Sequence, residues 1–131
     1  MRIGYKLATE AFGPTEIVVQ TRLAEQAGFD FVGLSDHFHP WLEEQGHSGF
    51  TWSMLGSIAA STERIGLVTG VTFPSFRYHP AVIAQAAATM RCCPGGASRS
   101  ESDPGSGSMS TWSGSSRSCG AAMRSSARRW R

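Results

Sequence analysis

The sequence of 131 residues has no long apolar run. A membrane-spanning helix needs roughly 20 consecutive apolar residues, and no segment approaches that length. The first residues also lack the basic, apolar and small-residue blocks of a secretory signal. Because 40% of the residues are hydrophobic and the mean hydropathy is -0.18, we expect a globular domain in the cytoplasm, without a membrane partner.

Cysteine is scarce, with only Cys92, Cys93 and Cys119. Their spacing matches neither the disulfide framework of a small secreted protein nor a Cys-x-x-Cys metal motif. A redox or metal role is the alternative, but we interpret the three cysteines as incidental.

Acidic residues and large aliphatic residues are both rare in the last third of the chain. Residues 1–90 contain five Lys or Arg against eight Asp or Glu, whereas residues 91–131 contain seven Arg and two acids. This last segment has twelve Ser and six Gly, and it has no Val, Ile, Leu or Phe. Such a composition cannot form a packed core. We therefore expect a folded domain over residues 1–90 and a disordered Ser/Gly/Arg-rich tail over residues 91–131.

The tail has two interpretations. A basic arm could bind nucleic acid, with Trp112 and Trp130 stacking on bases. The other interpretation is that the tail is translated out of frame, and we favour it, so we expect no nucleic-acid partner.

Residues 1–90 alternate between strand and helix patterns. Strands are expected from Ile3 to Leu7, from Phe31 to Ser35 and from Ile65 to Val71. A first helix begins near Pro14 and stops at Gly28. A second ends at residues 62–64, and a third runs from Pro80 to Met90. The residues expected to face the sheet are Val19, Leu23 and Ala27, then Leu55, Ile58 and Ala59, and finally Val82 and Ala86.

Three β-then-α units predict a parallel sheet of the α/β class. A doubly wound sheet usually has a glycine-rich turn after its first strand, and residues 8–12 contain no glycine. A (β/α)8 TIM barrel is therefore favoured. Such a barrel typically needs about 250 residues, so at most its first three βα units are present.

The loop after the second strand carries Asp36, His37 and Trp41. The C-terminal rim of a β/α barrel is where catalysis takes place. A carboxylate that orients an imidazole, beside an aromatic wall, suits proton transfer. The alternative is an ordinary loop in which these residues have only structural contacts.

The same loop contains several potential metal ligands. His37, His39 and His47 lie near Asp36, Glu43 and Glu44 in the sequence, and His-x-His is common among zinc ligands. No recognised spacing supplies the remaining ligands, however, and Pro40 restricts His39. We therefore expect no metal.

The loop after the third strand could accept a planar ring. Gly70 would let the backbone approach the ring closely, and Phe73, Phe76 and Tyr78 could form an apolar slot. Arg77 could hold a phosphate or carboxylate, but we expect it to form a structural salt bridge.

These two loops carry a family resemblance. Ser-Asp-His-Phe-His-Pro-Trp at 35–41, Pro-Ser-Phe-Arg-Tyr-His-Pro-Ala-Val-Ile-Ala-Gln-Ala at 74–86 and Gly-Tyr-Lys at 4–6 resemble the glucose-6-phosphate dehydrogenase group of the F420-dependent, luciferase-like oxidoreductases. The resemblance covers about the first 90 residues.

The resemblance implies roles for several residues. Asp36, Gly70, Val71 and Phe73 would contact the deazaflavin of coenzyme F420, with an unusual backbone bulge at Gly70-Val71. His37 would be the catalytic base and Trp41 would stabilise the intermediate. Hydride would pass between an alcohol or sugar-phosphate carbon of a small-molecule substrate and F420. The alternative within the superfamily is an FMN-dependent monooxygenase, and we expect full-length relatives to be homodimers.

The family's proton-donating glutamate, which follows the fourth strand, has no counterpart in this chain. Arg91 to Gly114 can be back-translated with GC-rich codons and read in a shifted frame. One permitted choice of third bases gives LLPGRRFTLGIGSGERLNEHVVG, a strand and a Gly-rich loop of the kind that the family has next. We therefore expect a frameshifted, truncated remnant with little activity.

Overall fold

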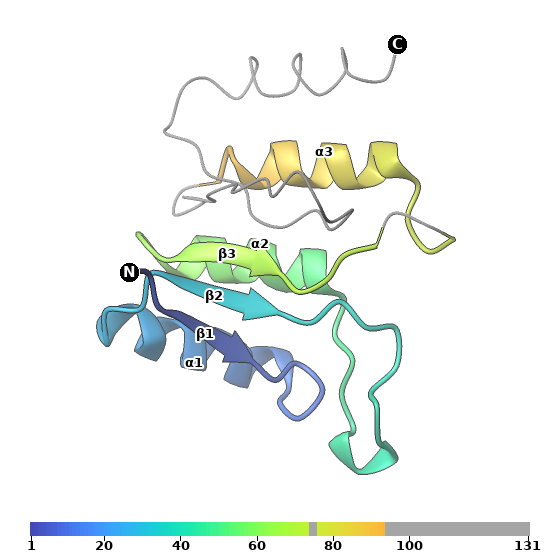
Figure 1. Cartoon of the computed structure of the whole chain (residues 1–131), viewed down its shortest axis with the longest axis horizontal. Helices are drawn as coiled ribbons and strands as arrows, with labels where there is room; N and C mark the ends of the chain where they lie inside the picture. The colour runs from blue at the N-terminus through green and yellow to red at the C-terminus, as the bar shows by residue number, and fades with distance from the viewer. Residues whose placement is uncertain (74–75, 94–131) are drawn as a thin grey trace.

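The computed structural model describes residues 1–73 and 76–93, and these form a three-stranded parallel sheet with helices packed against it (Figure 1). The strands are β1 (Gly4–Leu7), β2 (Phe31–Leu34) and β3 (Gly66–Thr69), in the order β1-β2-β3. The helices are α1 (Pro14–Gln26), α2 (Thr51–Ser61) and α3 (Pro80–Met90), with a short 3-10 helix η1 (Glu43–Gln45). The predicted α/β fold with three parallel strands is confirmed.

The strand register aligns the ends of all three strands. Leu7 pairs with Leu34, and Leu34 pairs with Thr69. Because the strands are parallel, the loops that follow them start at the same edge of the sheet. Residues 8–13, 35–50, 70–73 and 76–79 therefore meet at this edge, which we call the rim.

The core lies between the sheet and helices α1 and α2. Leu7, Val32 and Leu34 are fully buried, and Ile17 of α1 and Ile58 of α2 pack with them. Figure 1 shows α1 and α2 on one side of the sheet, while α3 packs against α2. The predicted buried face of α2, formed by Leu55, Ile58 and Ala59, is confirmed.

The predicted buried face of α1 is wrong. Val19 and Leu23 are 50% and 58% exposed. The residues that face the sheet are instead Ile17, Thr21 and Ala24. Thr21 can be buried because its hydroxyl donates a hydrogen bond of 2.8 Å to the carbonyl of Ile17.

Two further predictions differ from the structure. In α3 the buried residues are Ile83, Ala87 and Ala88, and Val82 is 51% exposed. The strands are also shorter than predicted, since the last ladder hydrogen bond on β3 runs from Gly70 N–H to the Leu34 carbonyl at 2.7 Å. The helix stop at Gly28 is confirmed, because this residue has a φ of 87° that favours glycine.

A partly exposed contact joins the end of α1 to the turn just before β3. The Glu25 carboxylate accepts hydrogen bonds from three successive backbone N–H groups, those of Glu63, Arg64 and Ile65, at 3.1, 2.6 and 2.9 Å. Burial by itself would raise the pKa of Glu25, but these hydrogen bonds and the Arg64 charge outweigh it, so the pKa is lowered. The α2–β3 turn is therefore fastened to α1.

The opposite face of the sheet is formed by the alternate residues of each strand. On this face Lys6 pairs with Gly33, and Gly33 pairs with Val68. The stem of Lys6 passes over Gly33, where an added Cβ would lie 3.8 Å from Lys6 Cδ.

Within residues 1–73 and 76–93, no helix is long and apolar enough to cross a membrane. In the same part of the chain, no three His, Cys, Asp or Glu side chains form a group that could hold a metal ion. The prediction of a disordered, frameshifted tail without a nucleic-acid partner concerns mainly residues 94–131, which lie outside the described residues.

Candidate active site

A cluster of polar side chains lies at the rim. Glu10 follows β1, Asp36 and His37 follow β2, and Thr72 and Tyr78 follow β3. Two of the loops are tied together through the backbone, because His47 N–H donates to the Glu10 carbonyl at 3.1 Å. Parallel pairing therefore brings side chains up to about 70 positions apart into one site.

His37 and Glu10 form an acid–base pair. Nδ1 of His37 lies 2.5 Å from Oε1 of Glu10, whose side chain is only 8% exposed. Burial would raise the pKa of Glu10, but hydrogen bonds from its own backbone and from the Ser35 side chain, together with the charge and hydrogen bond of His37, lower it. An ionised Glu10 this close to Nδ1 favours the tautomer in which Nδ1 carries the proton and Nε2 carries the lone pair.

Trp41 lies against the outer edge of His37. The two ring centroids are 5.1 Å apart and the planes meet at 86°, an edge-to-face arrangement. Trp41 is 77% exposed, so much of its ring is open to a ligand. The loop is anchored beneath the pair, because the Ser48 hydroxyl donates to the His37 carbonyl at 2.8 Å. The two predicted catalytic residues therefore lie together.

Asp36 lies beside this pair but faces inward. Its side chain is fully buried. Oδ2 accepts a hydrogen bond of 2.7 Å from the Thr72 hydroxyl, and Oδ1 accepts one of 2.9 Å from the Tyr78 hydroxyl. Arg77 adds a salt bridge of 3.1 Å to Oδ1 and a hydrogen bond of 2.9 Å to the Asp36 carbonyl. Asp36 thus joins the second rim loop to the third.

Tyr78 belongs to this junction and not to an open slot, which corrects one prediction. It is 6% exposed. Burial, together with the hydrogen bond to Asp36 and its negative charge, raises the pKa of Tyr78 to about 12. The guanidinium of Arg77 lies 4.8 Å from the Tyr78 ring centroid. The predicted structural salt bridge of Arg77 is present, and its partner is Asp36.

Gly70, Val71 and Phe73 form an open, largely apolar surface on the third rim loop. Val71 is 52% exposed and Phe73 is 66% exposed. An added Cβ at Gly70 would have only Lys6 Nζ, at 3.7 Å, and the Leu34 carbonyl, at 4.0 Å, near it. The Gly70–Val71 peptide bond is cis, at the position where an unusual backbone is predicted. A flat apolar group could therefore lie against this backbone.

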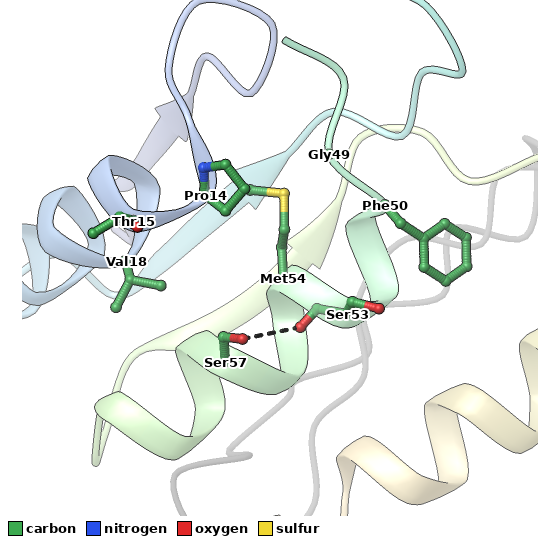
Figure 2. A pocket seen from close by; sticks show the side chains of 8 residues that line it. All are labelled: Pro14, Thr15, Val18, Gly49, Phe50, Ser53, Met54 and Ser57. Carbon is green, nitrogen blue, oxygen red and sulfur yellow. Dashed lines mark hydrogen bonds between the residues drawn. The ribbon is translucent and has the colours of Figure 1, made fainter.

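A separate pocket of about 290 Å³ lies in the helical layer (Figure 2). It is lined by the first turns of α1 and α2 and the residues just before α2, among them Pro14, Val18, Phe50 and Met54. In Figure 2 the sulfur of Met54 points toward Pro14, and the Ser57 hydroxyl donates to the Ser53 carbonyl. None of the acid–base residues lines this pocket, so the rim is the better candidate for chemistry.

Sequence reasoning missed Glu10. No motif marks it within residues 8–12, but its place directly after the first strand is a usable signal. A carboxylate there must lie at the same edge as Asp36 and His37 once the three strands pair in parallel. The position of Lys6, whose ammonium lies near Glu10, was missed for the same reason.

Comparison with known proteins gives consistent results. A family model described as luciferase-like monooxygenase matches residues 1–96. The F420-dependent glucose-6-phosphate dehydrogenase of Beutenbergia cavernae is 51% identical over 92 residues, which are 70% of this chain and 27% of that enzyme. The enzyme of the same name from Rhodococcus erythropolis is 49% identical over 92 residues, with the same coverage.

A solved structure agrees with this result. An F420-dependent secondary alcohol dehydrogenase, in complex with an F420-acetone adduct, superposes with a TM-score of 0.67 and 37% identity, covering 70% of this chain and 28% of that one. The chain spans about 27% of the length of the curated relatives it matches. The three βα units match the start of a TIM-barrel enzyme.

Proposed function

The chain belongs to the luciferase-like monooxygenase family, and from this we propose that its rim is the first part of an F420-dependent oxidoreductase site. The reaction would be hydride transfer between an alcohol or sugar-phosphate carbon and F420. The observation that carries the proposal is the pairing of Glu10 with His37 at the rim, next to the exposed Trp41.

The proton side of this reaction follows from the geometry of the pair. Nδ1 of His37 faces Glu10, so Nε2 is free to accept the proton of a substrate hydroxyl. The negative charge of Glu10 stabilises the imidazolium that forms, as a buried carboxylate does beside a catalytic histidine. The exposed ring of Trp41 would shield the protonated imidazole from water on one side.

The residues present fit the flat part of the cofactor. Gly70 has no side chain to hold the ring away, and Val71 and Phe73 offer apolar surface beside it. When bound, F420 would supply the ring carbon that accepts the hydride. The Asp36 carboxylate already has Thr72, Tyr78 and Arg77 as partners. A direct contact with the cofactor would therefore require one of these three interactions to break.

Several further predictions belong to the same proposal. The chain by itself is a truncated remnant with little turnover, and residues 91–131 are read from a shifted frame. The full-length relatives act as homodimers on a small-molecule substrate in the cytoplasm. The shifted frame and the truncation are supported by the Ser/Gly/Arg-rich composition of the tail and by the share of the relatives' length that the chain spans.

The test begins with the coding DNA. About 480 bases beyond codon 90 should continue in the shifted frame as the remaining βα units, because a barrel of this kind needs about 250 residues and about 90 are already present. An insertion or deletion near codon 90 that restores this frame should then give a protein that reduces F420 with glucose 6-phosphate or with a secondary alcohol. The unaltered chain should show little activity with either substrate.

Variants of the frame-restored protein would identify the acid–base pair. His37→Asn should lower kcat by roughly a hundredfold or more, which is the usual contribution of a positioned general base. Glu10→Gln should lower kcat less. Turnover with reduced FMN and oxygen but not with F420 would instead support the monooxygenase alternative, and a downstream sequence without a barrel pattern in any frame would contradict the proposal.

A further inference from the structure

Lys6 crosses the sheet to reach the third rim loop. Its side chain starts on β1 and passes over Gly33 of β2. Its ammonium donates a hydrogen bond of 2.8 Å to the Ser35 hydroxyl and makes a longer contact of 3.5 Å with the Gly70 carbonyl. One side chain thus connects β1 to the loops that follow β2 and β3.

The path of Lys6 depends on the glycine beneath it. An added Cβ at Gly33 would only touch the stem of Lys6, at 3.8 Å, but a larger side chain would occupy the space that the stem now fills. The same is true at the other end, where a Cβ at Gly70 would lie 3.7 Å from the ammonium nitrogen. The Lys6 side chain therefore lies over one glycine along its stem and beside a second glycine at its ammonium.

The electrostatic surroundings are consistent with a held ammonium. Partial burial lowers the pKa of Lys6, and the nearby charge of Glu10 offsets part of that effect. The charged group near the ammonium is therefore Glu10, and His37 is linked to it because it pairs with Glu10. An ammonium has three donors, and Ser35 and Gly70 accept only two of them.

We propose that Lys6 is a positioning residue, which holds the Gly70 carbonyl and so sets the backbone of residues 70–71 against a bound ring. For the identity of that ring the inference rests on the proposed function. The contact of Lys6 with Ser35 and Gly70 does not depend on any ligand. The two ideas can therefore fail separately.

The test uses the whole chain labelled with ¹⁵N and ¹³C. Lys6 is the only lysine in the sequence, so its Nζ signal needs no assignment by mutation. Nuclear Overhauser contacts are expected between the ε protons of Lys6 and the α protons of Gly70. Lys6→Met should shift the Gly70 carbonyl and Val71 amide signals, and Lys6→Arg should restore most of that shift by supplying a donor again.

Arg22→Met is the matched control, since it removes an exposed cation on α1 far from the rim. It should leave the signals of Gly70 and Val71 in place. Unchanged signals in Lys6→Met would overturn the proposal. Should that variant fail to fold, missing Overhauser contacts between Lys6 and Gly70 in the unaltered chain would overturn it equally.

A second arm measures binding of F420 to the frame-restored protein by fluorescence titration. Lys6→Met in that protein should weaken binding about tenfold, the equivalent of about 1.4 kcal/mol, with Lys6→Arg in between. Equal affinity of the two variants and the frame-restored parent would refute the positioning role toward the cofactor. If the frame-restored parent does not bind F420 while the Overhauser contacts are present, the cofactor assignment fails and the Lys6 contact stands.

Discussion

Replacing Glu25 with alanine should lower the free energy of unfolding more than an alanine substitution at any other residue of α1 that is not buried. The carboxylate accepts three successive backbone N–H groups at the start of β3, two of them at 2.9 Å or less. A hydrogen bond to a charged group contributes about 1.5–3 kcal/mol, and bonds that share one oxygen do not add fully. Because Glu25 is only half-buried, we expect a loss of about 2 kcal/mol in the free energy of unfolding.

Urea unfolding followed by circular dichroism at pH 7 measures this loss. In a domain of this size about 1 kcal/mol corresponds to roughly 4–8 °C in Tm, so thermal unfolding offers a second measurement. Glu63→Ala is the matched control, because it removes a carboxylate from the same turn while keeping the backbone N–H that donates to Glu25. The control should unfold within about 0.5 kcal/mol of the unaltered chain.

The pH dependence gives a sharper version of the same test. The pKa of Glu25 is lowered in the folded state from its usual value near 4.5. The unfolded chain therefore binds more protons as the pH falls below that value, and stability decreases with it. The difference between the unaltered chain and Glu25→Ala should be full above about pH 5 and should shrink as the pH falls through the folded-state pKa. Equal stability of Glu25→Ala and Glu63→Ala at pH 7, or a difference that does not shrink in acid, would refute the reasoning.

Three other predictions concern single residues. The raised pKa of about 12 means that Tyr78 favours folding below pH 10, and that this contribution is lost as the pH rises toward 12. Tyr78→Phe should remove that late transition from an ultraviolet titration and lower stability by about 1–2 kcal/mol, as Asp36 loses a donor. Ile17→Ala should cost about 2–4 kcal/mol in chemical denaturation, while Leu23→Ala should change stability by less than about 0.5 kcal/mol; equal losses would contradict the assigned face of α1. Gly28→Ala should cost about 1 kcal/mol, because its φ of 87° is unfavourable for any side chain, and an unchanged midpoint in urea would argue against that conformation.

The layout of the rim could be predicted because it follows from strand order. Three strands of one direction put every following loop at one edge, so Asp36, His37 and Gly70 were placed correctly from their positions after β2 and β3. Glu10 obeys the same rule. Its partner, however, lies 27 positions away, and nothing local to residue 10 shows that it meets an imidazole.

The errors arose where hydrogen bonds decide burial. Thr21 of α1 faces the protein core because its hydroxyl donates a hydrogen bond to the Ile17 carbonyl one turn earlier. A pattern built on apolar residues alone selects Val19 and Leu23 instead. Tyr78 was expected in an open slot because it is aromatic. It is buried because its hydroxyl donates a hydrogen bond to Asp36, 42 positions earlier. Hydrophobic periodicity contains no information about partners at that separation.

The pairing of β1 with β2 has a consequence for synthesis. Glu10 and His37 lie in the loops that follow these two strands, so the pair is complete once β2 has docked beside β1. Because chains emerge from the ribosome with the N-terminus first, the pair of Glu10 and His37 can assemble before anything beyond β2 and its following loop has folded. Later segments would then meet a preassembled imidazole and carboxylate instead of having to bring them together.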